Sequence, residues 1–178
     1  MAIGAVPVED GRVRLGRALY TLVRPTRPPE VGAVLVHKLR TADLAGAPPL
    51  SEGLAGLLAL LDGRVPVFHT AAVERAFLGR AFSARGARLP AAADTEELGR
   101  SWLRERGEVT PPRLPLPRLA RLVGAPAEAP HHALSDALTT ACAFVALASL
   151  LDARRPQTVG TLLSASTPVR GARRLGPV

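Results

Sequence analysis

The last helical pattern of the chain, from about Ala133 to Arg154, places the strongest constraint on its fold. Its apolar side chains recur every three to four residues, which predicts one long helix with a broad apolar stripe. Such a helix must pack across much of a domain. The chain has 178 residues, enough for one compact domain and too few for two comfortable ones. We therefore expect one domain over residues 1–155, and a basic, flexible tail over residues 156–178, where Ser, Thr, Pro, Gly and Arg predominate.

The remaining sequence predicts a sheet and several further helices. Residues 3–8 and 13–23 predict two strands joined by an Asp10-Gly11 turn, a residue pair that tolerates positive φ. Helices are predicted from a cap at Ser51 to Gly63, after Asp94, and from Pro117 to Gly124. The pattern is that of an α/β protein.

One strand is followed by polar residues in a way that predicts a site. Residues 65–68 predict a short buried strand, which runs through His69 and Thr70 into a helix over residues 71–80. A polar pair between a strand and a helix lies at the carboxyl edge of a sheet, where α/β proteins place their ligands. His69 and Thr70 are therefore candidate site residues, although they could equally cap the helix.

The charge of the chain gives a weaker indication of its partners. The formal net charge is +8, almost wholly from arginine, since Lys38 is the only lysine. A basic balance favours polyanionic partners such as nucleic acid. Arginine with abundant alanine, glycine, proline and leucine is also typical of GC-rich genomes, so the charge alone decides little. Aromatic residues make up 3%, too few for the stacking platforms of single-strand binding modules.

Localisation is predicted from what the sequence lacks. No apolar run approaches the roughly 20 residues that cross a bilayer, and the first residues lack the pattern of a signal peptide. We expect a cytoplasmic protein without a membrane partner. Cys142, the only cysteine, suits a reducing compartment and is expected to be a small core residue.

A histidine and an acid open the long helix. His131 precedes Asp136 by five residues, and Glu74 lies on the helix that follows His69 and Thr70. Phosphodiester hydrolysis with two metal ions needs carboxylates to hold the ions and a base to deprotonate water. Asp136 and His131 supply one of each. Without further context, such residues are more often a helix-start histidine and a solvated acid.

In their order and spacing, these segments resemble the DEDDh 3′→5′ exonuclease family, which includes the proofreading subunit of bacterial DNA polymerase III. Residues 131–137 resemble its third motif, and residues 67–78 resemble its second motif, with Glu74 in the place of an aspartate. Weaker support comes from the predicted hairpin, residues 36–48 and Asp94-Thr95. The resemblance covers about residues 3–152. It implies a ribonuclease-H-like mixed sheet flanked by helices.

The resemblance also implies roles for individual residues. Asp136 and Glu74 would be ligands of Mg²⁺ or Mn²⁺, and His131 would be the general base. Substrate contacts would come from His69, Thr70 and His37. The implied function is metal-dependent hydrolysis at DNA or RNA 3′ ends, with a DNA polymerase subunit as a further candidate partner. Asp94 is expected to be a structural helix cap instead.

One family motif, an Asp-x-Glu pair on the first central strand, is absent from these residues. Without that strand we expect a gap in the sheet between the hairpin and residues 65–68, which leaves backbone groups unpaired. Two divalent ions would bring four positive charges, against two carboxylates from Asp136 and Glu74. Three explanations are open, namely a true start upstream, a decayed relative, or a strand donated by another chain. We favour the first.

Two other functions compete with the exonuclease. A non-catalytic module on the same fold could hold nucleic acid ends or a polymerase, and it would bind in a salt-sensitive way without hydrolysis. A Ser-His-Asp hydrolase built on Ser135 is disfavoured, because no Gly-x-Ser-x-Gly turn surrounds that serine.

Overall fold

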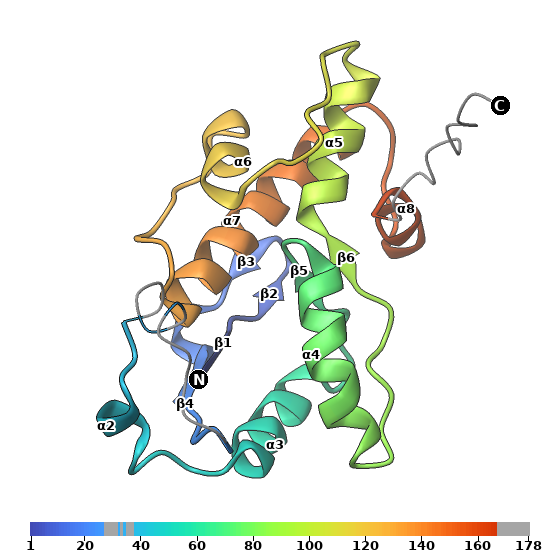
Figure 1. Ribbon diagram of the computed structural model, residues 1–178. Helices are drawn as coiled ribbons and strands as arrows, with labels where there is room; N and C mark the ends of the chain where they lie inside the picture. Colours follow the sequence, from blue (N-terminus) through green and yellow to red (C-terminus); the bar gives the residue numbers. More distant parts are fainter. Residues whose placement is uncertain (27–31, 33, 35–37, 167–178) are drawn as a thin grey trace, which may run out of the picture.

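The N-terminal part of the chain forms the predicted hairpin. The computed structural model describes residues 1–26, 32, 34 and 38–166 (Figure 1). Strand β1 (Ala2–Ala5) pairs with β4 (Leu19–Leu22) in antiparallel fashion, and β2 (Val8–Glu9) pairs with β3 (Arg12–Val13). Asp10 and Gly11 connect β2 to β3 with φ of 53° and 69°. Positive φ at both central residues matches the twist of the flanking strands, as the Asp-Gly pair predicted.

The helices and a second small sheet follow. Strand β5 (Val67–Phe68) pairs in parallel with β6 (Ala93–Asp94), a strand of two residues that the sequence did not indicate. The helix predicted from Ser51 begins earlier, with Pro49 at its N-cap and no side-chain cap, so the assignment of Ser51 as cap was wrong. Over residues 38–166, the α-helices are α2 (Thr41–Leu44), α3 (Leu50–Leu61), α4 (Ala71–Ser83), α5 (Thr95–Glu105), α6 (Leu116–Leu122), α7 (Ala133–Asp152) and α8 (Val159–Ala165). Residues 15–17 form a 3-10 turn.

Two groups of buried side chains hold the domain together. One lies among α5, α6 and α7 and includes Leu98, Leu119 and Leu147, none of which is exposed. The other joins the hairpin to α3 and α4 through Ile3, Leu57 and Phe82 together with their neighbours. Helix α7 contacts β1 at one end and α5 and α6 further along (Figure 1). Helix α3 contacts β4, and α4 contacts β5. The long helix therefore packs across much of the domain, as its stripe predicted.

Helix α7 is more apolar than expected. It has 20 residues and a mean hydropathy of 1.7, so by length and composition alone it could cross a membrane. The expectation that no segment approaches this limit was wrong. Core helices of soluble proteins meet the same criterion of length and composition. Here α7 packs against β1, α5 and α6, and its half-buried Cys142 has a raised thiol pKa because of burial.

Part of the C-terminal segment is more ordered than expected. Residues 156–178 were predicted to have little fixed structure, but they include α8, in which Thr158 caps the helix by accepting a hydrogen bond from the Thr161 amide at 3.1 Å. Leu162 and Leu163 pack against the buried core, and α8 contacts α5 and β6. Residues 167–178 lie outside the described part.

The sheet is interrupted where a central strand was expected to be absent. Within the described ranges, the strands form three separate pairs, and no ladder joins β1 to β5. Both of these strands line one cavity of about 1620 Å³. The predicted gap in the sheet is therefore present as a real space inside the protein.

Gly4 brings the hairpin against the start of α7. A Cβ atom at this position would overlap the carbonyl oxygen of Ala133 and lie 2.6 Å from the Leu134 nitrogen. These are backbone atoms and cannot rotate away, so Gly4→Ala is expected to lower the free energy of unfolding by about 1–3 kcal/mol. Urea denaturation measures this. Gly79→Ala in α4 is the matched control, since nothing lies near its Cβ position, and this change should be neutral or stabilising.

Candidate active site

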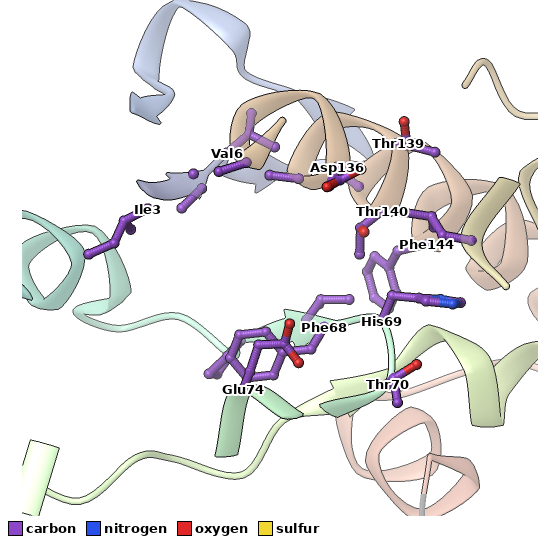
Figure 2. Close-up of a pocket in the computed structure, with 18 of the residues that line it drawn as sticks. Ile3, Val6, Phe68, His69, Thr70, Glu74, Asp136, Thr139, Thr140 and Phe144 are labelled. Carbon is purple, nitrogen blue, oxygen red and sulfur yellow. The ribbon is translucent and has the colours of Figure 1, made fainter. Parts of the chain in front are cut away.

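The predicted site residues gather around the cavity, with one exception. His69, Thr70, Glu74, His131 and Asp136 all line it. They come from the end of β5, the first turn of α4 and the start of α7, and Figure 2 shows His69, Thr70, Glu74 and Asp136 around a common space. His37 lies outside the described residues. Segments separated by some 60 residues in sequence thus meet at one place, as the order of motifs predicted.

The start of α7 holds His131 and Asp136 together. His131 has a φ of 70°, which turns the chain sharply just before the N-cap residue His132. The Oδ1 atom of Asp136 accepts a hydrogen bond from the His131 backbone amide at 3.3 Å. The carboxylate therefore helps to fix the turn that carries the histidine.

A buried carboxylate organises the opposite side of the site. Asp94 is only 9% exposed and accepts hydrogen bonds from the backbone amides of Thr70 (3.1 Å), Ala71 (2.8 Å) and Glu96 (2.9 Å). It therefore satisfies the first amides of two helices, α4 and α5, which have no partners within their own helices. The prediction that Asp94 is a structural cap is confirmed.

His69 is fixed by a chain of hydrogen bonds. The Thr95 hydroxyl donates to the carbonyl oxygen of Phe68 at 3.2 Å and lies 2.9 Å from Nδ1 of His69. Because the hydroxyl donates its one proton to Phe68, it accepts from Nδ1 of His69. Burial lowers the pKa of His69, although Glu96, Asp94 and a backbone hydrogen bond at Leu114 act in the opposite direction.

The side chain of Thr70 does not cap helix α4. It is the N-cap residue of α4 with a φ of 62°, and its hydroxyl donates to Oε2 of Glu96 at 2.7 Å. A β-branched residue with positive φ is strained, and such strain is often found at functional sites. The capping of α4 falls to Asp94, so the alternative role of Thr70 as a side-chain cap was wrong.

Glu96 is a site residue that sequence reasoning missed. It is 6% exposed and accepts hydrogen bonds from Thr70 and from the Leu114 backbone amide, the latter at 2.9 Å. Burial raises its pKa, but these hydrogen bonds outweigh burial and hold the pKa below its usual value. An acid two residues after a cap resembles any helix start, so only the fold reveals this contact.

A second missed contact lies beside His132. The Tyr20 ring of β4 stacks on the His132 ring with centroids 4.8 Å apart and an angle of 22° between the planes. Both residues line the cavity. Tyr20 was treated only as part of a strand, and no spacing in the sequence connects it to the start of α7.

Glu74 projects into the cavity from α4, on the wall opposite Asp136 (Figure 2). Its Oε2 atom is buried and has no hydrogen-bond partner in the described part of the chain. Burial raises the pKa of Glu74, and the nearby Asp94 adds to this. A buried carboxylate oxygen without a partner is costly, and a hard cation would relieve that cost.

The described residues do not form a metal site by themselves. Oxygen atoms of Glu74 and Asp136 are suitable ligands for Mg²⁺ or Mn²⁺. Among the described residues, however, no group of three or more His, Cys, Asp and Glu side chains is placed to hold an ion. Two carboxylates on opposite walls fall short of the donor set that two divalent ions require. The carboxylate oxygens are suitable ligands for these ions, but two carboxylates are too few to hold both.

The raised pKa of Glu74 leads to a pH-dependent stability. Its folded-state pKa lies above the unfolded value, so its ionisation opposes folding as the pH rises through the folded pKa. Glu74→Gln is therefore expected to stabilise the protein at pH 7 and to have little effect near pH 4. Urea midpoints at both pH values test this. Glu52→Gln, at an exposed acid of α3, is the control, and an equal gain from both changes would contradict the account.

Comparisons with known proteins identify relatives of this chain. The sequence model of a family described as exonuclease matches residues 1–144. A relative in Rhodobacter capsulatus, described as a DNA polymerase III subunit epsilon-like protein, is 33% identical over 164 residues. That alignment covers 91% of this chain but 23% of the relative, so the chain spans about a quarter of its length. The solved structure of exonuclease X in complex with 5′ overhanging duplex DNA matches with a TM-score of 0.62 and 20% identity, over 93% of this chain and 90% of that one.

Proposed function

Because this chain belongs to the exonuclease family, and to its DEDDh type, we propose that it acts on the 3′ ends of nucleic acids. Membership places the chain among nucleases in a general sense. The direction of hydrolysis, its dependence on Mg²⁺ or Mn²⁺ and the residues that carry it are parts of the proposal. The net charge of +8 is consistent with a polyanionic substrate.

One observation carries the proposal. His131, just before α7, and Asp136 of α7 line the same cavity as His69, which follows β5, and Glu74 of α4. A chance His and Asp at a helix start would have no reason to face the end of β5. The meeting of both segments at one cavity is what a hydrolytic site needs, since acid, base and substrate contacts must converge.

The chain's own groups would divide the work as follows. His131 would take the proton from the attacking water, because an imidazole nitrogen can act as a general base. His69, held by Thr95, would hydrogen-bond to a hydroxyl of the terminal nucleotide. Glu74 and Asp136 would supply two of the carboxylates for the divalent ions on which this family generally depends. Because these two do not complete a site, we expect slow hydrolysis by these 178 residues alone.

A direct assay uses single-stranded DNA and RNA oligonucleotides labelled at the 5′ end, with the chain in excess. We expect stepwise shortening from the 3′ end that requires Mg²⁺ or Mn²⁺ and stops with EDTA. The same oligonucleotide with a blocked 3′ end is the control. Shortening from the 5′ end, or shortening unaffected by EDTA, would contradict the proposal.

A second candidate function is favoured by the incomplete donor set. A non-catalytic module on this fold would bind nucleic acid ends, or a polymerase, without cutting. It predicts no shortening in the assay above, and binding that weakens steeply as salt rises. The description of the R. capsulatus relative as polymerase III epsilon-like makes a polymerase subunit a reasonable partner to test.

A further inference from the structure

Two arginines line the cavity in the described part of the chain, and one of them is unpaired. Arg64 forms an ion pair with Glu9 at 2.8 Å. Arg113 lies in the segment that connects α5 to α6 (Figure 1) and is exposed. Its guanidinium forms no hydrogen bond or ion pair with any residue that the structure describes. The donors of Arg113 are therefore available to an anion that enters from solvent.

The backbone that carries Arg113 is fixed on both sides. Leu114, the next residue, has no exposed surface and belongs to the buried core beside α5, α6 and α7. Its amide donates to Oε1 of Glu96 at 2.9 Å. Prolines precede Arg113 and follow Leu114, and a proline ring holds φ within a narrow range. Because this backbone is already rigid, only the side chain of Arg113 must be ordered when a ligand binds.

Glu96 lies near Arg113 but is already engaged. Its two carboxylate oxygens accept hydrogen bonds from the Thr70 hydroxyl at 2.7 Å and from the Leu114 amide at 2.9 Å. Burial raises the pKa of Glu96, whereas these hydrogen bonds and the nearby His69 and Arg113 lower it. The charge of Arg113 thus acts at the carboxylate, although no ion pair joins the two groups. Glu96 helps to keep the guanidinium at the cavity without occupying its donors.

The place of Arg113 beside His69 indicates which anion it meets. Burial lowers the pKa of His69, and a backbone hydrogen bond at Leu114 is among the effects that raise it, so this histidine lies beside the residue that follows Arg113. In the proposed function, His69 contacts a sugar hydroxyl of the terminal nucleotide. Sugars and phosphates alternate along a strand, which brings a phosphate within reach of an arginine beside that contact. Guanidinium groups bind phosphate through parallel hydrogen bonds.

The other charges of the cavity make such a contact useful. Glu74, Glu96 and Asp136 line the same space, and ionised carboxylates repel the phosphates of a strand. Within the described lining, Arg113 is the arginine whose charge no acid neutralises in an ion pair. It is therefore the group best placed to offset this repulsion.

We propose that Arg113 binds a phosphate of the nucleic acid strand near its 3′ end, and so helps to place the terminal nucleotide against His69. This inference deepens the proposed function and rests on it for the class of substrate. It assigns a substrate contact to a residue that the motifs of the sequence did not indicate.

Binding of single-stranded DNA to the full chain tests the proposal. Each oligonucleotide is labelled at the 5′ end and has one uncharged methylphosphonate linkage, placed at a different distance from the 3′ end. Fluorescence anisotropy at low salt in EDTA gives the affinity while metal-dependent hydrolysis is stopped. Wild type is compared with Arg113→Gln, Arg113→Lys and Arg118→Gln. Arg118 is an exposed arginine of α6 that does not line the cavity, so its variant removes the same charge elsewhere.

We expect one linkage near the 3′ end to stand out in the wild type. Loss of its charge should weaken binding about tenfold more than the same change at the 5′ end. Arg113→Gln should weaken binding of the unmodified strand by a similar factor and abolish the difference between linkages. Arg113→Lys keeps the charge without the planar fork, so it should retain part of the difference. Arg118→Gln should behave as the wild type does.

The proposal is wrong if no linkage stands out in the wild type, or if the same linkage stands out equally in Arg113→Gln. It is also wrong if Arg118→Gln removes the difference as completely, because the effect would then come from the general field of a basic surface. Urea midpoints should be the same for wild type and both Arg113 variants. A clear fall in both variants would contradict the unpaired guanidinium on which the proposal stands.

Failure of this proposal can be distinguished from failure of the proposed function. The affinities are measured without hydrolysis, so a linkage that depends on Arg113, without any 3′ shortening, would sink the proposed function and leave the phosphate contact intact. Efficient 3′ shortening, with no linkage that depends on Arg113, would do the reverse.

Discussion

Replacing Asp94 with alanine is expected to lower the free energy of unfolding by about 3–5 kcal/mol, because each buried amide left unpaired costs about 1–3 kcal/mol. The carboxylate accepts the amides of Thr70, Ala71 and Glu96, at the first turns of α4 and α5. Its loss would loosen both helices and the residues that lead into the site. Urea denaturation followed by circular dichroism measures the change.

Two further variants make the Asp94 experiment specific. Asp94→Asn keeps one acceptor oxygen and should lose only part of the stability. Asp62→Ala, at an exposed acid after α3, should change the stability by less than about 0.5 kcal/mol. If Asp94→Ala cost no more than Asp62→Ala, the three hydrogen bonds would not hold the site as described.

The second large effect is expected from His131→Ala. Removal of a general base typically lowers the rate by about 10²–10⁴-fold, so the 3′ shortening should fall to background. The fold should persist, since His131 is exposed and precedes α7. Single-turnover rates at several pH values give the comparison.

The adjacent histidine provides the matched control. His132→Ala removes the stacking on Tyr20 but takes no proton in this scheme, so most of the activity and its pH profile should remain. Equal losses from both changes would show that His131 acts only through the local structure of the turn.

Local patterns were enough to predict much of this fold. The Asp10-Gly11 turn, the helix after Thr70 and the long helix α7 are set by turn chemistry and by apolar spacing within short segments. The meeting of His69, Glu74 and Asp136 at one place was also predicted, because their segments follow the order and spacing of the family's motifs. The gap in the sheet followed from the motif that these residues lack.

Other features depend on contacts that no local pattern encodes. Strand β6 has two residues and forms only because β5 lies beside it. Glu96 accepts hydrogen bonds from Thr70, far before it in the sequence, and from Leu114, far after it. Helix α8 is stabilised by packing of its apolar side chains against the buried core. The sequence also could not predict that Oε2 of Glu74 is buried without a hydrogen-bond partner in the described part of the chain, because this depends on its surroundings in the fold.

The most direct measurement of the central claim compares wild type with Asp136→Asn in the 3′ shortening assay with excess protein and Mn²⁺. Asp152→Asn, at the far end of α7, is the matched control. We predict stepwise 3′ shortening by wild type and Asp152→Asn, and none by Asp136→Asn at unchanged stability. Equal shortening by all three proteins, or none by any of them, would contradict the assignment of this cavity as a nuclease site.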